Sequence, residues 1–225
     1  IPVSTRDKNQ SRKGFGSLNR WDWMACLVFL GFAIVYFFGH LNGNYPQVIL
    51  TGDAGNIASY AAALDHPDWF STDAVLGHPE IFGVYATIHV PLIRLLNLMV
   101  GNYGLASSLL IIPQTFLQLL GFYILGRVLF RNRFWGFLLA FLTAMTVNDI
   151  GLGEIWGVWP DSLPRVLFQS LLPFILALSL VWKDYPRRWP WLMVLAGLLV
   201  YVHPISAPAW GFALWISFWL FHPRE

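Results

Sequence analysis

The chain of 225 residues alternates long apolar runs with short basic stretches, and this alternation restricts its fold more than any other feature. Hydrophobic residues make up 56% of the sequence and charged residues only 12%, whereas about 25% is typical of soluble domains. A helix of about 20 apolar residues can cross a bilayer. The sequence therefore predicts an all-α, polytopic membrane helical bundle. We expect about six spans, at Trp23–His40, Tyr103–Gly126, Phe134–Val147, Val166–Trp182, Trp189–His203 and Pro208–Phe221.

Basic residues indicate how these spans are oriented, because loops rich in Lys and Arg stay in the cytoplasm. With six spans and a cytoplasmic N-terminus, every basic cluster falls on the cytoplasmic side. We therefore predict a basic tail over residues 1–22 and a transmembrane domain over 23–225, in the plasma (inner) membrane. Topology explains the clusters better than nucleic-acid binding does. The clusters are Arg6, Lys8, Arg12, Lys13 and Arg20; Arg127, Arg131 and Arg133; and Lys183, Arg187 and Arg188.

The apolar run from Val84 to Val100 is expected to lie in the outer interface rather than to span. If it spanned, the cluster around Arg127 would be forced to the external face. Arg94 would also cost roughly 2.5–3.5 kcal/mol at the bilayer centre. Pro91 suits the first turn of an interfacial helix, where its missing N–H is no loss. The first external loop, residues 41–102, then carries short interfacial helices, and the next ones are 148–165 and 204–207.

Acidic residues concentrate in this first loop, which holds five of the 12 acids in the chain, namely Asp53, Asp65, Asp68, Asp73 and Glu80. A membrane protein that gathers carboxylates at one water-facing surface commonly binds or reacts there. Asp53 is expected to cap a short helix whose Ala-rich part runs from Ala58 to Leu64. Tyr60 shares a helix face with Asp53 and could contact the same ligand.

The arrangement resembles the N-terminal module of type-C (GT-C) membrane glycosyltransferases, such as protein mannosyltransferases and aminoarabinose transferases. The residues that carry it are GDAGNIASYAAA, with its acid, Tyr and Ala, and the later HVPLIRLLNLMVGNYG, within residues 51–133. The resemblance implies transfer of a sugar from a polyprenyl-phosphate-linked donor to an external acceptor, with the carboxylate of Asp53 as the catalytic group, a candidate general base. His89 stands where the family has a basic residue that helps to bind the lipid phosphate.

Arg94 and Arg165 are two further candidates for binding the lipid phosphate. Both are predicted at the outer boundary of the membrane, where that phosphate would lie. Each could instead anchor to lipid headgroups or pair with Asp161, and Asp53 could merely cap its helix.

The second external loop, NDIGLGEIWGVWPDSLPR, adds Asp149 and Glu154 as acidic partners. It has no Asp-x-Asp motif, so a divalent metal (Mg²⁺ or Mn²⁺) is left open. The spacing of His66, Asp68, Asp73, His78 and Glu80 matches no closed zinc site, and the single Cys26 allows no disulfide framework.

The alternative function is a non-catalytic membrane subunit that packs in a larger membrane complex through its acidic loop. A transporter half is disfavoured, because the sequence shows no paired broken helices. The expected partners are membrane lipids, the polyprenyl-phosphate-sugar donor and, on the alternative, other membrane subunits, with no nucleic acid.

Overall fold

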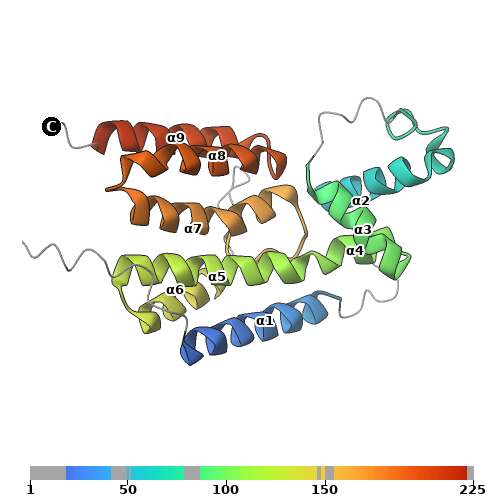
Figure 1. The fold of residues 1–225 in the computed structure, drawn as a ribbon. Helices are drawn as coiled ribbons and strands as arrows, with labels where there is room; N and C mark the ends of the chain where they lie inside the picture. Colours follow the sequence, from blue (N-terminus) through green and yellow to red (C-terminus); the bar gives the residue numbers. More distant parts are fainter. Residues whose placement is uncertain are drawn as a thin grey trace, which may run out of the picture.

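The computed structural model describes residues 19–41, 50, 52–78, 87–145, 148–149 and 155–221. These residues are all-α apart from one two-residue ladder (Figure 1). The short helices η2 (Pro67–Phe70), η4 (Pro186–Arg188) and η5 (Leu199–Tyr201) join longer elements. The longer elements are α1 (Arg20–Leu41), α2 (Gly52–Asp65), α3 (His89–Val100), α4 (Tyr103–Leu109), α5 (Ile111–Phe130), α6 (Arg133–Met145), β1 (Asn148–Asp149), β2 (Ile155–Trp156), α7 (Pro164–Trp182), α8 (Trp189–Leu198) and α9 (Ser206–Phe221).

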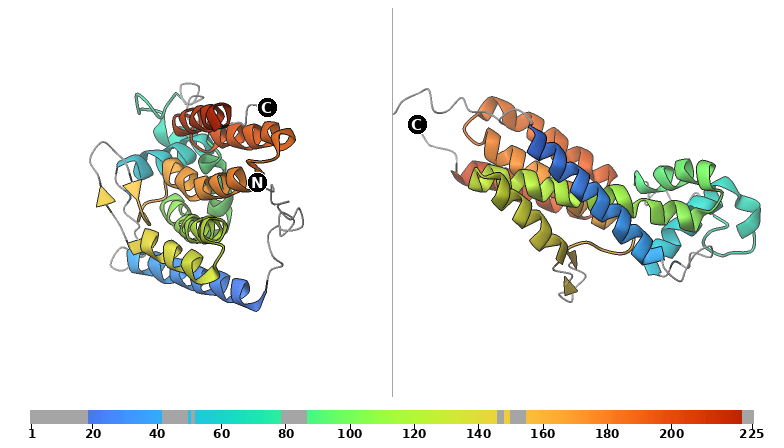
Figure 2. Two further views of the ribbon diagram at one scale, coloured as in Figure 1. Left: turned by 90° about the vertical axis from the view of Figure 1, so that its left-hand side faces the viewer. Right: turned by 90° about the horizontal axis from the view of Figure 1, so that it is seen from below.

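Three helical stretches are long and apolar enough to cross a membrane, namely Arg20–Leu41, Tyr103–Phe130 and Pro164–Trp182. They form one helical body with α6, α8 and α9, and consecutive members of this body run in opposite directions (Figure 1). Seen along its length, the body has α5 at its centre, with α1 and α6 on one side and α7 to α9 on the other (Figure 2).

Prolines and polar caps set several of these boundaries. Pro113 lacks an N–H and its ring clashes with the carbonyl four residues earlier, which accounts for the break between α4 and α5 at Leu110. Pro164 occupies the first turn of α7, where no hydrogen bond is lost. Asn132 begins α6 by accepting a hydrogen bond from the Phe134 N–H at 2.8 Å.

The core of the body lies between α1, α5 and α6. Phe29 is fully buried there, with its ring 5.7 Å from that of Tyr123 and 5.6 Å from that of Phe137. Gly126 on α5 faces Gly136 on α6 so closely that a Cβ on Gly126 would lie 2.7 Å from the Gly136 Cα. The two glycines therefore let the helix backbones touch.

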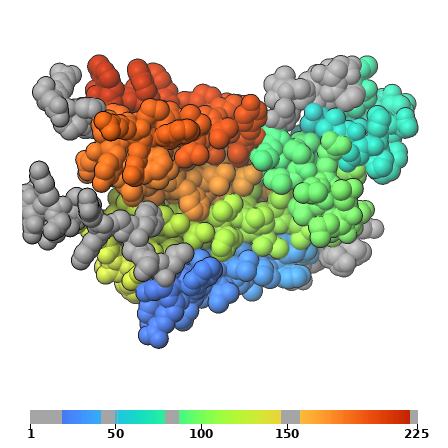
Figure 3. Space-filling model, viewed as in Figure 1, coloured from blue at the N-terminus to red at the C-terminus, as the bar shows by residue number. Residues whose placement is uncertain are grey.

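At one end of the body, α2 and α3 pack on α4, the first part of the Tyr103–Phe130 stretch, and form a lobe with it (Figure 3). Its core contains Ala61, Ile93 and Ala106, all with no exposed area. The 12-residue helix α3 packs mainly on α4 and α2 rather than on the long helices of the body. The run that was predicted to lie in the interface thus forms a helix in this lobe, outside the helical body.

The basic residues that the structure describes in these clusters lie at the opposite end of the body, where α1 begins and where α5 joins α6 and α7 joins α8 (Figure 1). We call this the basic end and the other the lobe end. Asp22 is buried at the basic end and accepts hydrogen bonds from Tyr123 Oη at 2.6 Å, Arg127 Nη1 at 2.8 Å and Arg133 Nε at 3.3 Å. A buried carboxylate with these three donors fixes the start of α1 to α5 and α6.

The outer surface of the helical body is apolar. Leu27 and Val35 on α1 are 68% and 71% exposed, and Trp219 on α9 is 65% exposed. Soluble monomers rarely expose apolar patches of this extent. The surface is that of a protein in contact with lipid or with another apolar surface.

The span predicted over Phe134–Val147 is slightly shorter in the structure. α6 ends at Met145, and Asn148 and Asp149 pair with Trp156 and Ile155 in an antiparallel ladder. Asn and Asp favour turns over helix interiors, which accounts for the end of the helix. Of the predicted tail over residues 1–22, residues 1–18 lie outside the described part of the chain, and α1 begins at Arg20.

Candidate functional site

Four segments converge at the lobe end of the helical body: the first turns of α2, α3 and α7, and the connection between α8 and α9. Ala54 of α2 packs on Leu163 and Val166, which flank the start of α7. The Ile88 N–H, just before α3, donates to the Tyr201 carbonyl at 2.7 Å. Residues more than 100 positions apart in the sequence therefore meet at one place.

The segment 157–163 lies among these elements as a bent stretch without helix or strand, and side chains hold it in place. Gly157 turns it with a φ of 99°, a conformation that favours glycine. A backbone without internal hydrogen bonds is tolerated at membrane depth only where protein groups satisfy it. Here three donors do so: Gln118 Nε2 to the Gly157 carbonyl at 3.1 Å, Tyr36 Oη to the Val158 carbonyl at 3.2 Å, and Gln114 Nε2 to the Asp161 carbonyl at 3.3 Å.

His89 supplies a fourth contact to this segment. Its Nε2 lies 2.8 Å from Ser162 Oγ, and both residues are almost completely buried. Burial lowers the pKa of His89 to about 4, against a small opposing effect of the Ser162 contact. The ring is therefore neutral near pH 7, and His89 adds no positive charge for the phosphate that the sequence assigned to it.

Arg94 forms an ion pair with Asp65, which the sequence did not predict. Its Nε donates to Asp65 Oδ1 at 2.7 Å, and Tyr103 Oη donates to the other carboxylate oxygen at 2.8 Å. Burial raises the pKa of Asp65, but the hydrogen bonds from Arg94 and Tyr103 outweigh it and hold that pKa below its usual value. The three side chains join α2, α3 and α4, so Arg94 supports the lobe.

Arg165 is the cation at the convergence point. It lies in the first turn of α7, and its Nε is buried with no hydrogen-bond partner among the described residues. No carboxylate in the described part of the chain lies within 4.0 Å of its nitrogens, so the predicted pair with Asp161 does not form.

His203 lies close to Arg165. Burial first, and then the charge of Arg165, lower the pKa of His203. Its Nδ1 is 2.8 Å from Ser206 Oγ, and its ring centroid is 6.3 Å from that of Phe168 on α7. The pKa shift favours the neutral ring, which leaves Arg165 as the charged group here.

Asp53 is exposed in the first turn of α2. α2 begins at Gly52, two residues before the first helical position that a cap at Asp53 would require, so Asp53 lies inside the first turn. Because its neighbour Ala54 packs beside Leu163 and Val166, Asp53 and Arg165 stand on adjoining first turns. Tyr60 lies two turns further on and is buried in the lobe core, away from the surface on which Asp53 is exposed.

The side chains of the acids predicted in the second loop, Asp149 and Glu154, lie outside the described part of the structure. Glu154 lies outside the described residues, and only the backbone of Asp149 is described, where it pairs with Ile155. Within the described residues, no group of three or more His, Cys, Asp or Glu side chains is placed to hold a metal ion.

Sequence reasoning missed the residues that hold the 157–163 segment. Gln114 and Gln118 are four apart in an otherwise apolar run, which places both on one helix face. Polar side chains within a span usually face the protein interior. That spacing was the available signal for an interior polar contact, although it could not identify the partner segment.

Comparisons with protein-family models, with curated proteins and with solved structures find no match for this chain. Its class therefore rests on the fold and on the lobe-end site. These define an all-α protein that has three helices able to span a membrane and, on adjoining helix starts, an exposed carboxylate and a half-buried arginine.

Proposed function

We propose that the chain is a polytopic integral membrane protein with six spans, formed by α1, α4 with α5, α6, α7, α8 and α9, and with a cytoplasmic N-terminus in the plasma (inner) membrane. The alternating directions of these helices and the gathering of the basic clusters at one end support this topology. The lobe end then faces the outside, and α3 lies at the outer interface.

We further propose that the protein is a GT-C-like glycosyltransferase, which transfers a sugar from a polyprenyl-phosphate-linked donor to an external acceptor. The observation that carries this proposal is the packing of Ala54 on Leu163 and Val166. It brings an exposed carboxylate, Asp53, to a helix start that adjoins the start holding Arg165, whose Nε has no hydrogen-bond partner among the described residues. In the proposed topology both lie toward the outer boundary of the membrane.

The two groups have the chemistry that the transfer needs. Asp53 accepts the proton of the acceptor hydroxyl as the acceptor oxygen bonds to the anomeric carbon of the sugar. The bond between that carbon and the phosphate oxygen breaks, and its electron pair leaves with the polyprenyl phosphate. Arg165, with its planar set of donors, stabilises the phosphate charge.

The test is transfer of radiolabel from lipid donors by the purified full chain in membranes. The donors are polyprenyl phosphates carrying labelled mannose, glucose or aminoarabinose, offered with water as the basal acceptor and with a hydroxyl-bearing peptide. We expect release of label from at least one donor and a loss of 100-fold or more in Asp53→Asn, since general bases contribute about 10²–10⁴-fold.

Asp68→Asn is the matched control, because Asp68 is an exposed acid in the same region. It should retain the activity of the unmodified chain. Full activity in Asp53→Asn would overturn the proposal for Asp53. No activity with any donor would favour the non-catalytic membrane subunit instead.

A further inference from the structure

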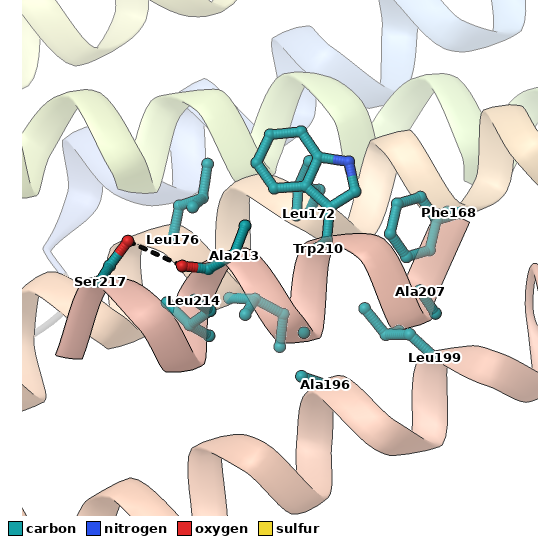
Figure 4. A pocket seen from close by; sticks show the side chains of 12 residues that line it. Phe168, Leu172, Leu176, Ala196, Leu199, Ala207, Trp210, Ala213, Leu214 and Ser217 are labelled. Atoms are coloured by element: carbon teal, nitrogen blue, oxygen red, sulfur yellow. Dashed lines mark hydrogen bonds between the residues drawn. The ribbon is translucent and has the colours of Figure 1, made fainter. Parts of the chain in front are cut away.

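An apolar cavity of about 100 Å³ lies between α7, α8 and α9. Side chains from all three helices line it, and Figure 4 shows them pointing into a shared space. Among them are Phe168, Leu172, Leu176, Leu199, Trp210 and Leu214. The hydroxyl of Ser217, at the edge, donates to the Ala213 carbonyl at 2.8 Å, so the lining offers hydrocarbon contacts almost throughout.

The size of the cavity limits what it can hold. A cavity of about 150 Å³ lined by apolar side chains stays dry and binds benzene. At about 100 Å³, this cavity takes a short piece of one hydrocarbon chain, such as a branched five-carbon unit, and not two chains side by side. Trp210 is 46% exposed at its edge, so the space opens onto the outer surface of the body.

One end of the cavity adjoins the cation of the lobe-end site. Phe168 lines the cavity and follows Arg165 by three residues, which is less than one helical turn along α7. Ala207, also in the lining, donates its N–H to the His203 carbonyl at 3.1 Å. A positive guanidinium with an unpartnered donor thus stands next to a narrow apolar space.

We propose that this cavity holds an isoprene unit of a single-chain isoprenyl phosphate, with the phosphate at Arg165 and the chain descending between α7 and α9. The inference rests on the proposed function for the identity of the lipid and adds the place where its chain lies. A charged head beside an apolar, one-chain space matches an amphiphile of this shape. A two-chain phospholipid matches it less well.

The experiment measures binding of farnesyl phosphate to the purified full chain in detergent, by the rise in Tm and by calorimetric titration. Ala213→Phe fills the cavity from α9, whereas Ala209→Phe places the same ring on the same helix outside the lining. We expect Ala213→Phe to weaken binding at least tenfold and Ala209→Phe to leave it unchanged. The Tm of each variant without ligand shows that both remain folded.

Arg165→Gln separates the head from the chain. It should weaken binding of farnesyl phosphate at least tenfold and leave binding of farnesol, which has the same chain without the phosphate, unchanged. Equal binding by Ala213→Phe and the unmodified chain would overturn the inference, as would equal or tighter binding of dioleoyl phosphatidic acid, a two-chain phosphate lipid.

Failure of this inference can be told apart from failure of the proposed function, because binding is read without an acceptor. Farnesyl phosphate that binds and is sensitive to Ala213→Phe, in a protein that transfers no sugar, would support the chain site and refute the transferase. Sugar transfer that is insensitive to Ala213→Phe would support the transferase and refute the chain site.

Discussion

His89 shows how burial sets the charge of a single residue at the lobe end. Its pKa falls from 6.5 to about 4 because the ring is buried. Since the folded value lies below the unfolded one, the unfolded chain takes up the proton first as the pH falls. The stability that neutral His89 supports is complete above pH 6.5 and is lost as the pH falls from there toward about 4.

We therefore expect the free energy of unfolding to decrease with falling pH more steeply in the unmodified chain than in His89→Gln, which cannot titrate. The difference in slope should approach about 1.4 kcal/mol per pH unit between the two pKa values. Chemical denaturation in detergent across that range measures it. Identical slopes would show that His89 is not buried in its neutral form.

Asp22 gives a second prediction at the residue scale. Its carboxylate is 1% exposed and neutralises Arg127, whose side chain is only 14% exposed. Asp22→Asn leaves that charge buried without its partner, at a cost of about 3–5 kcal/mol. Asp184→Asn, at an exposed acid of the same basic end, should change stability by less than about 0.5 kcal/mol. Thermal unfolding measures the stability of the two variants. Equal stability would contradict the role of Asp22 in neutralising the buried Arg127.

The residue-level contacts were only partly predictable from the sequence. Asp53 and Arg165 were identified because each adjoins an apolar run at the outer boundary. The pairing of Arg94 with Asp65 was not, since the two residues are 29 positions apart and meet only when α2 packs on α3. Asp22 was assigned to the basic tail. The sequence around it does not indicate that Arg127 and Arg133 contact it in the folded chain.

At the scale of elements, the contact of α5 with α6 depends on two glycines. A Cβ on Gly136 would lie 2.8 Å from the Tyr123 carbonyl oxygen, a backbone atom that cannot rotate away. Gly136→Ala should therefore separate the helices and cost about 1–3 kcal/mol, as overpacking does. Gly31→Ala, on α1 with open space around it, should stabilise by about 0.5–1 kcal/mol. Denaturation of both variants tests this, and a neutral Gly136→Ala would contradict the close packing.

Helix positions followed from hydropathy, whereas helix ends did not. The predicted span at Tyr103–Gly126 is two helices with a break at Leu110, and it continues to Phe130, where Arg131 adopts a φ of 53°. Apolar periodicity does not register a proline inside a run or a residue that leaves the helical conformation. The ends were set by this local chemistry and, after α6, by the pairing of β1 with β2.

At the scale of the whole molecule, the proposed topology places Ile205 and Asp184 on opposite sides of the membrane. Ile205 is 79% exposed at the lobe end, and Asp184 is exposed at the basic end. In a Cys26→Ala background, Ile205→Cys should react with a membrane-impermeant maleimide added outside intact cells, and Asp184→Cys should react only after permeabilisation. The opposite pattern would invert the topology, and labelling of both from one side would refute it.

The overall order of helices was predictable because each predicted apolar span is mainly helical in the structure. The packing partners of each helix were not predictable, because helix surfaces that are apolar all round do not indicate which helices are neighbours. The lobe-end site arises from such packing: Ala54 meets Leu163 and Val166 across more than 100 residues. Hydropathy therefore could not predict which side chains meet at the lobe end.

The most direct test of the account is a structure of the full chain in lipid nanodiscs with farnesyl phosphate. The account predicts a phosphate bound at Arg165 at the outer boundary of the bilayer, with the carboxylate of Asp53 facing it across the first turns of α2 and α7. A phosphate bound elsewhere, or an Asp53 side chain turned away from a phosphate at Arg165, would contradict the proposed site.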